Sequence, residues 1–232
     1  MFTVFGGAGE SAPFGKRMAD ATIMHNHTTD LRLLIKTPAG FMPRFTPHYC
    51  QGRLPVAFVF SVPGTEEINC GRPVSGATGD NLEHALGHLY ILAPQVFPSS
   101  HRYDYRITNA FTQPLAQDLG NGRTEATRAE ILESTNVRRF LGEVEGCQLV
   151  ILCGKKAHLL FTVLEGTLPL VIQVAHTGNK GLNRSFRLLR DWHLSSPADR
   201  RQERARLWAN GLVREISKCP CFTLTTKKLK SA

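Results

Sequence analysis

Several features that mark other classes of protein are missing from this sequence. No stretch approaches the ~18 consecutive uncharged apolar residues that a membrane-spanning helix needs. Residues 1–11 lack the basic start and apolar run of a secretory signal. Internal repeats and low-complexity tracts are missing too. We therefore expect a cytoplasmic protein without a membrane partner, and its 232 residues fit one large domain with a small appendage better than two full domains.

Cysteine is scarce, with six residues and no C-x-x-C pair. Cys219 and Cys221 are separated by a single proline, which is too tight a spacing for an ordinary zinc knuckle. We expect reduced thiols, because the spacing is not that of a disulfide-stapled secreted domain. Cys147 and Cys153 flank an apolar run, which favours a place in the core. The sequence therefore predicts no metal and no cofactor.

Acidic residues are few relative to basic ones. Asp and Glu number 19 against 28 Lys and Arg, which gives a formal net charge of +9. Such an excess favours a polyanionic partner, with nucleic acid as the first candidate. Hydrophobic residues make up 42% and charged residues 20%, which is ordinary globular usage.

Four short apolar runs are present, and each ends in a polar or glycine-containing turn. They are rich in Val, Ile and Leu without strict alternation, which is typical of strands buried on both faces of a parallel sheet. Longer helical or polar stretches separate them, so the pattern predicts an α/β fold. The runs are Val56 to Phe60, Tyr105 to Thr108, Gln148 to Cys153 and Leu168 to Val174.

The clearest helix is the last one. Ser196 as N-cap, Pro197 at the first helical position and Asp199 three residues after the cap form a variant of the capping box. We expect this helix to run to about Lys218, and its arginines are either a solvated face or a DNA contact. Three more helices are expected: Asn81 to Leu92 with Asp80 as N-cap, Thr124 to Glu145 with Thr124 as N-cap, and Lys155 to Leu164.

The composition divides the chain into three parts. Residues 1–50 mix Gly, Pro and His with one amphipathic stretch, and we expect them to form an N-terminal extension packed on the sheet. Residues 51–222 form the main domain. Residues 223–232 form a basic C-terminal tail.

Polar residues follow three of the four predicted strands. Ser61 to Glu67 follow the first, Asn109 follows the second, and His176 to Asn179 follow the fourth. The carboxyl ends of parallel strands meet at one edge of a sheet, where ligands bind. The pattern favours a site there, although turn formation by Pro63 and Gly64 and helix capping by Asn109 explain each piece separately.

The stretch from Pro63 to Gly79 resembles the first motif of the uracil-DNA glycosylase superfamily, in particular its iron-sulfur branch with the pattern G-E-x-P-G-x-x-E-x-x-x-G-R-P-F-x-G-x-x-G. Three further segments stand in the family's order. Ile107-Thr108-Asn109 is similar to I-T-N, Val150 to Ala157 to a hydrophobic strand followed by G-x-x-A, and His176-Thr177-Gly178 to H-P-S. The resemblance covers roughly residues 54 to 217 and implies a three-layer α/β/α fold with a central four-stranded parallel sheet.

The resemblance also implies roles for the matched residues. Asn109 reads the edge of a base turned out of the duplex, because an amide both donates and accepts hydrogen bonds. His176 donates to the base carbonyl as negative charge develops there, or it is a satisfied histidine beside the sheet. The expected lining of the base pocket is Ser61, Val62, Pro63, Gly64 and Val74.

Contacts to DNA are expected from the loop Gly178 to Ser185, which would press into the groove. Leu182 is either the wedge that fills the vacated stack or a residue that packs the loop. Lys180 or Arg184 would bind phosphate, and Arg72 is a further candidate for DNA contact.

The motif departs from the family where the water-positioning acid is expected. Ser61 stands where the iron-sulfur branch has Glu, and Val62 stands where family members often have Asp or Asn. Neither side chain acts as a base at neutral pH. We rank Glu67 first as the acid that orients water or stabilises a cationic sugar, followed by Glu66 and Asp80. The last two are equally explained as helix-end or solvated acids.

Two further departures concern the pocket and the cluster. Val74 replaces the phenylalanine that stacks on uracil, which predicts space for a pyrimidine enlarged at its 5-position. Gln113 and Val137 stand at or near positions of the cluster cysteines, so we expect no iron-sulfur cluster.

The sequence as a whole predicts a monomeric, monofunctional DNA glycosylase. Water rather than a lysine amine would attack the sugar, since no lysine matches a motif position, and an abasic site would remain. The substrate is uracil in repair, or a bulky base such as hydroxymethylated or glucosylated cytosine in defence against phage DNA. Val74 and the altered Ser61-Val62 pair favour the second. The rival interpretation is a non-catalytic DNA-binding relative that kept the fold and lost the acid.

Overall fold

A computed structural model of the chain describes residues 44–115, 122–166, 170–187, 189 and 196–219. The predicted basic tail lies outside these residues, and so does the predicted N-terminal extension up to residue 43. Residues 45–46 and 49–50 form strands of the central sheet, so the chain joins the sheet before residue 51.

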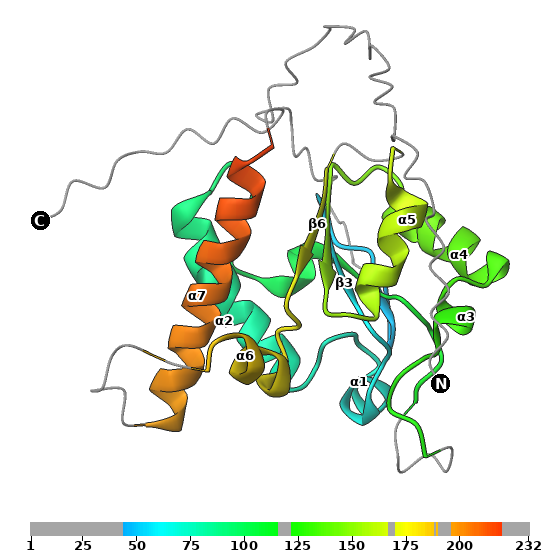
Figure 1. The fold of residues 1–232 in the computed structure, drawn as a ribbon, viewed down its shortest axis with the longest axis horizontal. Coiled ribbons are helices and arrows are strands. Elements are labelled where there is room, and N and C mark those ends of the chain that lie inside the picture. Colours follow the sequence, from blue (N-terminus) through cyan, green and yellow to red (C-terminus); the bar gives the residue numbers. More distant parts are fainter. Residues whose placement is uncertain (1–43, 116–121, 167–169, 188, 190–195, 220–232) are drawn as a thin grey trace, which may run out of the picture.

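A mixed sheet of six strands forms the centre of the described structure (Figure 1). Its order is β1-β2-β4-β3-β5-β6, and β4, β3, β5 and β6 pair in parallel. The two short strands at the edge pair antiparallel. The strands are β1 (Phe45–Thr46), β2 (Tyr49–Cys50), β3 (Leu54–Phe60), β4 (Tyr105–Asn109), β5 (Leu149–Cys153) and β6 (Leu170–Val174).

The α/β class predicted from the sequence is confirmed, and each predicted apolar run overlaps a strand. Four parallel strands are present, but the expectation that they make up the whole sheet is corrected, because two antiparallel edge strands make the sheet six-stranded and mixed. Strands of two residues are too short to show a period in the sequence, so β1 and β2 left no signal there.

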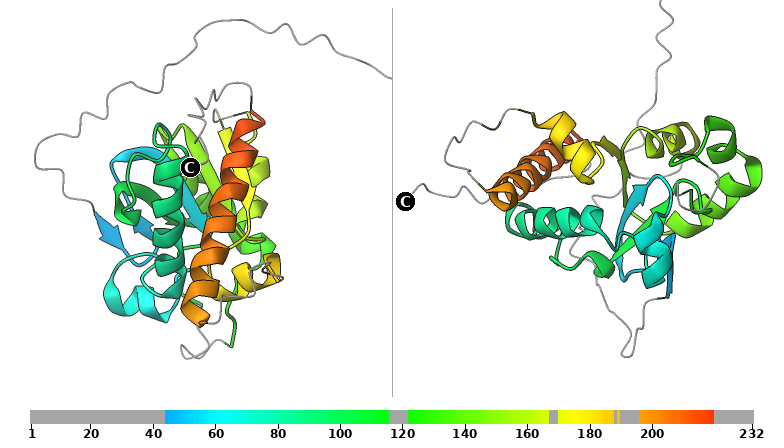
Figure 2. Two further views of the ribbon diagram at one scale, coloured as in Figure 1. Left: turned by 90° about the vertical axis from the view of Figure 1, so that its left-hand side faces the viewer. Right: turned by 90° about the horizontal axis from the view of Figure 1, so that it is seen from below.

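Helices lie on both faces of the sheet (Figures 1 and 2). On one face α2 and α7 lie side by side, with α6 beside them. On the other face lie α3, α4 and α5. The helices are α1 (Thr65–Cys70), α2 (Ala77–Leu92), α3 (Arg128–Ile131), α4 (Ser134–Val144), α5 (Phe161–Leu164), α6 (Asn179–Ser185) and α7 (Pro197–Ser217), with short 3-10 turns at Arg102–Asp104 and Ala157–Leu160.

Alternation along β3 gives the sheet two hydrophobic cores. Phe58 and Phe60 belong to the core under α2 and α7, whereas Ala57 and Val59 belong to the core under α3 to α5. All four are at most 3% exposed. Burial of each large apolar side chain contributes roughly 1.5–3 kcal/mol relative to exposure. The strand is therefore buried on both faces, as its unbroken apolar run predicts.

Helix α7 confirms the clearest prediction from the sequence. The Ser196 hydroxyl accepts a hydrogen bond from the backbone N–H of Asp199 at 3.0 Å, and the helix begins at Pro197. Trp208 lies on its buried face and donates from Nε1 to the carbonyl of Ala175 at 2.8 Å. This bond ties α7 to the segment that follows β6, where the predicted site lies.

Three predicted helices have different bounds in the structure. Helix α2 begins at Ala77 with Gly76 as N-cap, so Asp80 lies inside the helix rather than capping it. The expected helix from Thr124 to Glu145 is divided into α3 and α4, because Thr127 and Glu133 each cap a new helix start. The expected helix from Lys155 is a 3-10 turn followed by one turn of α5.

Cys147 and Cys153 are 3% and 0% exposed, which confirms their predicted place in the core.

Among the described helices none combines the length and the apolar character that crossing a membrane requires.

Candidate functional site at the carboxyl edge of the sheet

A cavity of about 1110 Å³ opens at the carboxyl ends of β3, β5 and β6. Its described lining comes from residues at or after the ends of β3, β4, β5 and β6, and they are Ser61, Val62, Pro63, Gly64, Thr65, Leu115, Thr124, Glu125, Cys153, Gly154, Lys155, Lys156, His158, Val174, Ala175, His176, Gly178, Asn179, Lys180, Gly181, Arg184 and Ser185. The predicted loop Ser61 to Gly64 and the predicted His176 therefore share one cavity.

The topology explains the position of this cavity. The chain passes from β3 to β4 on one side and then returns to β5 on the other side of β3. Connections leave β3 and β5 in opposite directions, and a crevice opens at such a switch point beyond the carboxyl ends of the strands.

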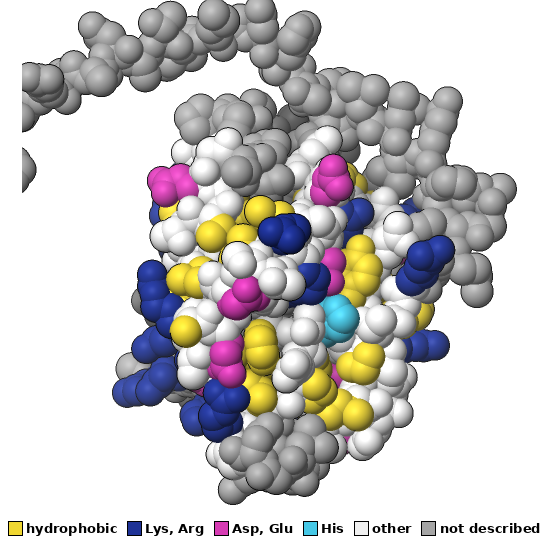
Figure 3. Space-filling view, turned by 90° about the vertical axis from the view of Figure 1, so that its right-hand side faces the viewer, with side chains coloured by type: hydrophobic (Ala, Val, Ile, Leu, Met, Phe, Trp, Pro, Cys, Tyr) yellow, Lys and Arg dark blue, Asp and Glu magenta, His cyan; other side chains and the backbone are white. Residues whose placement is uncertain are grey.

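Positive charge dominates the described lining of the cavity. Four side chains are Lys or Arg, namely Lys155, Lys156, Lys180 and Arg184, while Glu125 is the acid. A cavity with this balance favours an anionic ligand. On the face shown in Figure 3, acidic, basic and apolar side chains are interspersed around a histidine.

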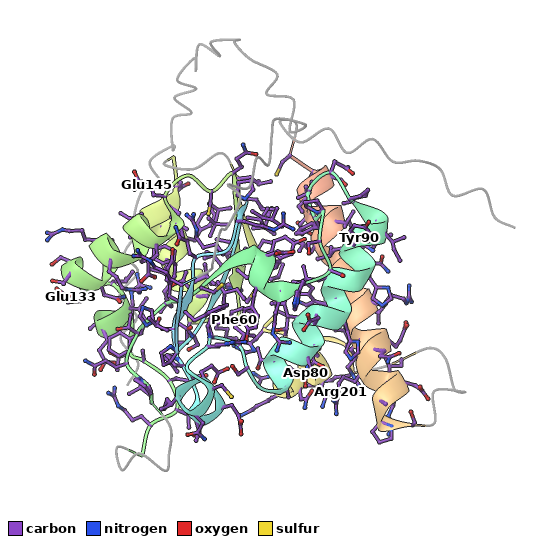
Figure 4. All side chains as sticks on the ribbon, turned by 180° about the vertical axis from the view of Figure 1, so that it is seen from behind. Phe60, Asp80, Tyr90, Glu133, Glu145 and Arg201 are labelled. Atoms are coloured by element: carbon purple, nitrogen blue, oxygen red, sulfur yellow. The ribbon has the colours of Figure 1, made fainter. Side chains whose placement is uncertain are left out.

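His176 follows β6 and presents a defined donor to the cavity. Its Nδ1 accepts a hydrogen bond from the backbone N–H of Gly178 at 2.9 Å, so in the neutral ring the proton lies on Nε2. Burial lowers the pKa of His176, and the charge of Glu125 opposes this more weakly. The ring packs edge-on against Phe60, with centroids 5.4 Å apart, and Figure 4 shows Phe60 in the interior of the molecule. His176 is therefore a neutral N–H donor at neutral pH.

Close packing around His176 requires glycine at two neighbouring positions. Gly154 has a φ of 93°, and a Cβ there would lie 3.0 Å from the Cβ of His176. A Cβ on Gly181 would lie 2.3 Å from the carbonyl oxygen of His176. These two glycines let β5 and α6 approach the histidine from two directions.

A buried hydrogen-bond tie fixes the His176 segment to α2. Asn81, which is 0% exposed, donates from Nδ2 to the carbonyl of Thr177 at 2.7 Å and to Oδ1 of Asn179 at 3.0 Å. In return the Thr177 hydroxyl donates to the carbonyl of Thr78 at 3.1 Å. No local pattern marks Asn81 as a site residue, because only the folded chain brings α2 to the end of β6.

The predicted acids have other surroundings. Glu67 uses both carboxylate oxygens on its own loop, accepting from the N–H of Gly64 at 2.9 Å and from that of Ser75 at 3.2 Å. Glu66 is exposed and does not line the cavity. Asp80 is exposed on α2, 3.7 Å from the guanidinium of Arg102, and also lies outside the cavity lining (Figure 4). The structure therefore places none of these three acids in the cavity.

Of the residues predicted to contact DNA, two line the cavity and two do not. Lys180 and Arg184 line the cavity. Residues 179–185 form helix α6 rather than a loop, and Leu182 is only 1% exposed. A wedge has to reach solvent, so the structure gives Leu182 the packing role that the sequence left open beside it. Arg72 lies over the ring of Phe45 at 4.8 Å, away from the cavity lining.

Asn109 and Val74 are both buried, at 3% exposure, and neither contributes to the cavity lining. Asn109 is paired with Phe60 in the sheet, and its Oδ1 has no hydrogen-bond partner among the described residues. Val74 has a φ of 55°, an uncommon conformation for a β-branched residue. It packs in the core under α2, which differs from the pocket-facing position predicted for it.

A partly buried ion pair, which was not among the predicted site residues, lies at the end of β4. Arg139 pairs with Glu143 and donates to Oδ1 of Asn136 at 2.9 Å and to the carbonyl of Asn109 at 3.0 Å. Burial lowers the pKa of Arg139, while Glu143 opposes this shift. His48 lies 3.2 Å from the second oxygen of Glu143. The helical spacing from 139 to 143 was visible in the sequence, but its link to β4 was not.

Comparison of the chain with models of known protein families gives no match, and a search of curated proteins gives none either. Within the described ranges, no group of three or more His, Cys, Asp or Glu side chains is arranged to hold a metal ion.

Proposed function

We propose that this protein is a monofunctional DNA glycosylase of the uracil-DNA glycosylase superfamily, with that family's three-layer α/β/α fold. It turns a base out of DNA and hydrolyses the N-glycosidic bond, leaving an abasic site. One observation supports this most directly: His176, a neutral N–H donor, lies in a cationic cavity beside the Ser61–Gly64 loop at the carboxyl edge of the sheet.

The charge of the cavity suits a flipped nucleotide. Lys180 and Arg184 on α6, together with Lys155, line its wall. These cations would bind the phosphates flanking the extruded base and so offset part of the unstacking cost, which is a few kcal/mol. We propose that the protein acts on DNA as a monomer in the cytoplasm and without a cofactor.

His176 supplies the electrostatic part of the reaction. As the glycosidic bond breaks, its electron pair moves into the base and negative charge develops on the base carbonyl. A preorganised Nε2–H stabilises this charge without having to lose a proton of its own. The Gly178 N–H fixes the tautomer, and the Asn81–Thr177 tie fixes the position of the ring.

Asn109 retains its proposed role as the reader of the base edge. Its buried, unpartnered Oδ1 is a hydrogen-bond acceptor without a donor, which is an unfavourable arrangement in the free protein. A base N–H reaching this oxygen would satisfy it. This role requires the cavity to extend toward β4 when DNA binds.

The volume of the cavity bears on the substrate. Pockets for small ligands commonly measure about 300–1,000 Å³. A cavity of about 1110 Å³ is larger than one pyrimidine needs, which favours a base enlarged at its 5-position, such as glucosylated hydroxymethylcytosine of phage DNA. The volume of the cavity, rather than the buried Val74, supports an enlarged base. Uracil in repair remains the alternative substrate.

The test is abasic-site formation on matched DNAs that contain uracil, hydroxymethylcytosine, glucosylated hydroxymethylcytosine or unmodified cytosine. We expect cleavage of one modified DNA under single-turnover conditions and its loss in His176→Ala. Binding of DNA without abasic sites on any substrate would favour the rival, a non-catalytic DNA-binding relative.

A further inference from the structure

The proposed hydrolysis needs an acid beside the reacting sugar, and the motif acids are not available for it. The oxygens of Glu67 accept from two backbone N–H groups of their own loop. Glu66 and Asp80 are exposed and lie outside the cavity lining. The carboxylate that attends the sugar therefore has to come from another segment.

Glu125 is the one acidic side chain in the described lining of the cavity. It lies between β4 and α3, on a segment that forms the wall of the cavity together with Leu115 and Thr124. His176 lies in the same cavity, and the charge of Glu125 acts on its ring. The donor and the acid are thus provided by chain segments about fifty residues apart.

A lysine lies beside this carboxylate. Nζ of Lys156 lies 3.7 Å from Oε2 of Glu125 and donates to the carbonyl of Ala126 at 2.7 Å. The bond to Ala126 anchors the lysine next to the acid, and the Glu125 side chain itself is 64% exposed. An exposed acid is accessible to water, which the reaction consumes.

We propose that Glu125 is the catalytic acid/base of this site, an inference that rests on the proposed function. A water oxygen bonds to the anomeric carbon of the sugar, and the bond from that carbon to the base nitrogen breaks with its electron pair on the base. Nε2–H of His176 stabilises the charge on the leaving base. The Glu125 carboxylate accepts the proton that water loses, and that proton finally neutralises the departed base. The products are an abasic sugar and a free base.

Glu125→Gln is the first variant to test, because it keeps the shape of an exposed side chain and removes its charge. A general base typically contributes 10²–10⁴-fold. We expect the single-turnover rate to fall at least ~100-fold while DNA binding stays equal or becomes tighter, since a negative charge leaves a cationic cavity. The matched control is Glu165→Gln, an exposed acid outside the cavity lining, which should leave both quantities unchanged.

Rescue separates a catalytic carboxylate from a merely electrostatic one. In Glu125→Ala, added formate should restore part of the lost rate, whereas the same formate should not accelerate the wild-type protein or His176→Ala. A Glu125→Gln protein that cleaves at the wild-type rate overturns this inference alone, and so does a rate loss that formate leaves unchanged. A wild-type protein that cleaves none of the DNAs overturns the proposed function and this inference with it.

Discussion

The Asn81 tie allows a prediction about stability that does not depend on the proposed function. Asn81 lies in the first half of α2 and is fully buried, and its Nδ2 donates to the Thr177 carbonyl and to the Asn179 side chain. These bonds hold the segment after β6 against α2. Removing the amide therefore removes the link between two elements that are far apart in the sequence.

The expected loss for Asn81→Ala follows from the bonds themselves. Two hydrogen bonds at roughly 0.5–1.5 kcal/mol each are lost, and the buried Thr177 carbonyl is left without this donor. The variant also removes Oδ1 of Asn81, a buried acceptor without a hydrogen-bond donor among the described residues, and this offsets part of the lost stability. We expect a net destabilisation of about 2 kcal/mol. For a chain of this size that corresponds to a fall in Tm of roughly 4–8 °C.

Thermal and urea unfolding followed by circular dichroism would measure this loss. His84→Ala is the matched control, because His84 is an exposed residue of the same helix and should change stability by less than about 0.5 kcal/mol. Asn81→Asp should cost more than the alanine variant, since it places a carboxylate oxygen against the Thr177 carbonyl. Equal Tm values for Asn81→Ala and His84→Ala would refute the reasoning.

The remaining predictions concern the site directly. His176→Ala should reduce the single-turnover rate by roughly 10²–10³-fold with DNA binding retained, and a variant that merely unfolds would support a packing role for this histidine. Burial lowers the pKa of His176 in the folded protein. As pH falls through ~6.5, the ordinary pKa of histidine, the unfolded chain therefore takes up a proton at this residue before the folded chain does. The free energy of unfolding should therefore not depend on the protonation of His176 above neutral pH, and it should decline as pH falls below the ordinary histidine pKa. Urea unfolding from pH 5 to pH 8 would measure this decline. The decline should be smaller in His176→Gln. Val74→Phe should destabilise by about 1–3 kcal/mol through overpacking rather than change base preference, which parallel unfolding and cleavage assays would check. Borohydride should trap no covalent protein–DNA adduct if water attacks the sugar, and an adduct lost in Lys155→Ala would instead identify a lysine nucleophile.

Local features of the sequence predicted the elements whose causes are local. The cap of α7 depends on Ser196, Pro197 and Asp199, which are close in the chain, and the structure confirms that start. The unbroken apolar run of β3 predicted burial on both faces, and Phe58 and Val59 confirm it. Polar residues directly after a strand predicted a site at the carboxyl edge, and the structure places a cavity there, with His176 and Ser61 in its lining.

The predicted helix starts were wrong where more than one residue in a stretch was able to cap a helix. The stretch from residue 124 to 145 was predicted as one helix, but Thr127 and Glu133 each accept a hydrogen bond from a backbone N–H and so start separate helices. Asp80 was predicted as a cap because it follows a glycine, whereas α2 begins one turn earlier at Ala77. In both cases several residues were capable of capping, and packing selected among them.

The sequence by itself determined the α/β class, the buried strands and the edge at which the cavity lies, because strand burial and the polar turns after strands depend on neighbours within a few residues. Only the tertiary structure decided which side chains meet there. Glu67 bonds its own loop, Leu182 is buried, and Glu125 faces the cavity that contains His176. The physical reason is that cavity lining and hydrogen-bond partnership depend on the packing of segments that are distant in the chain, such as Asn81 against Thr177, and no local pattern specifies that packing.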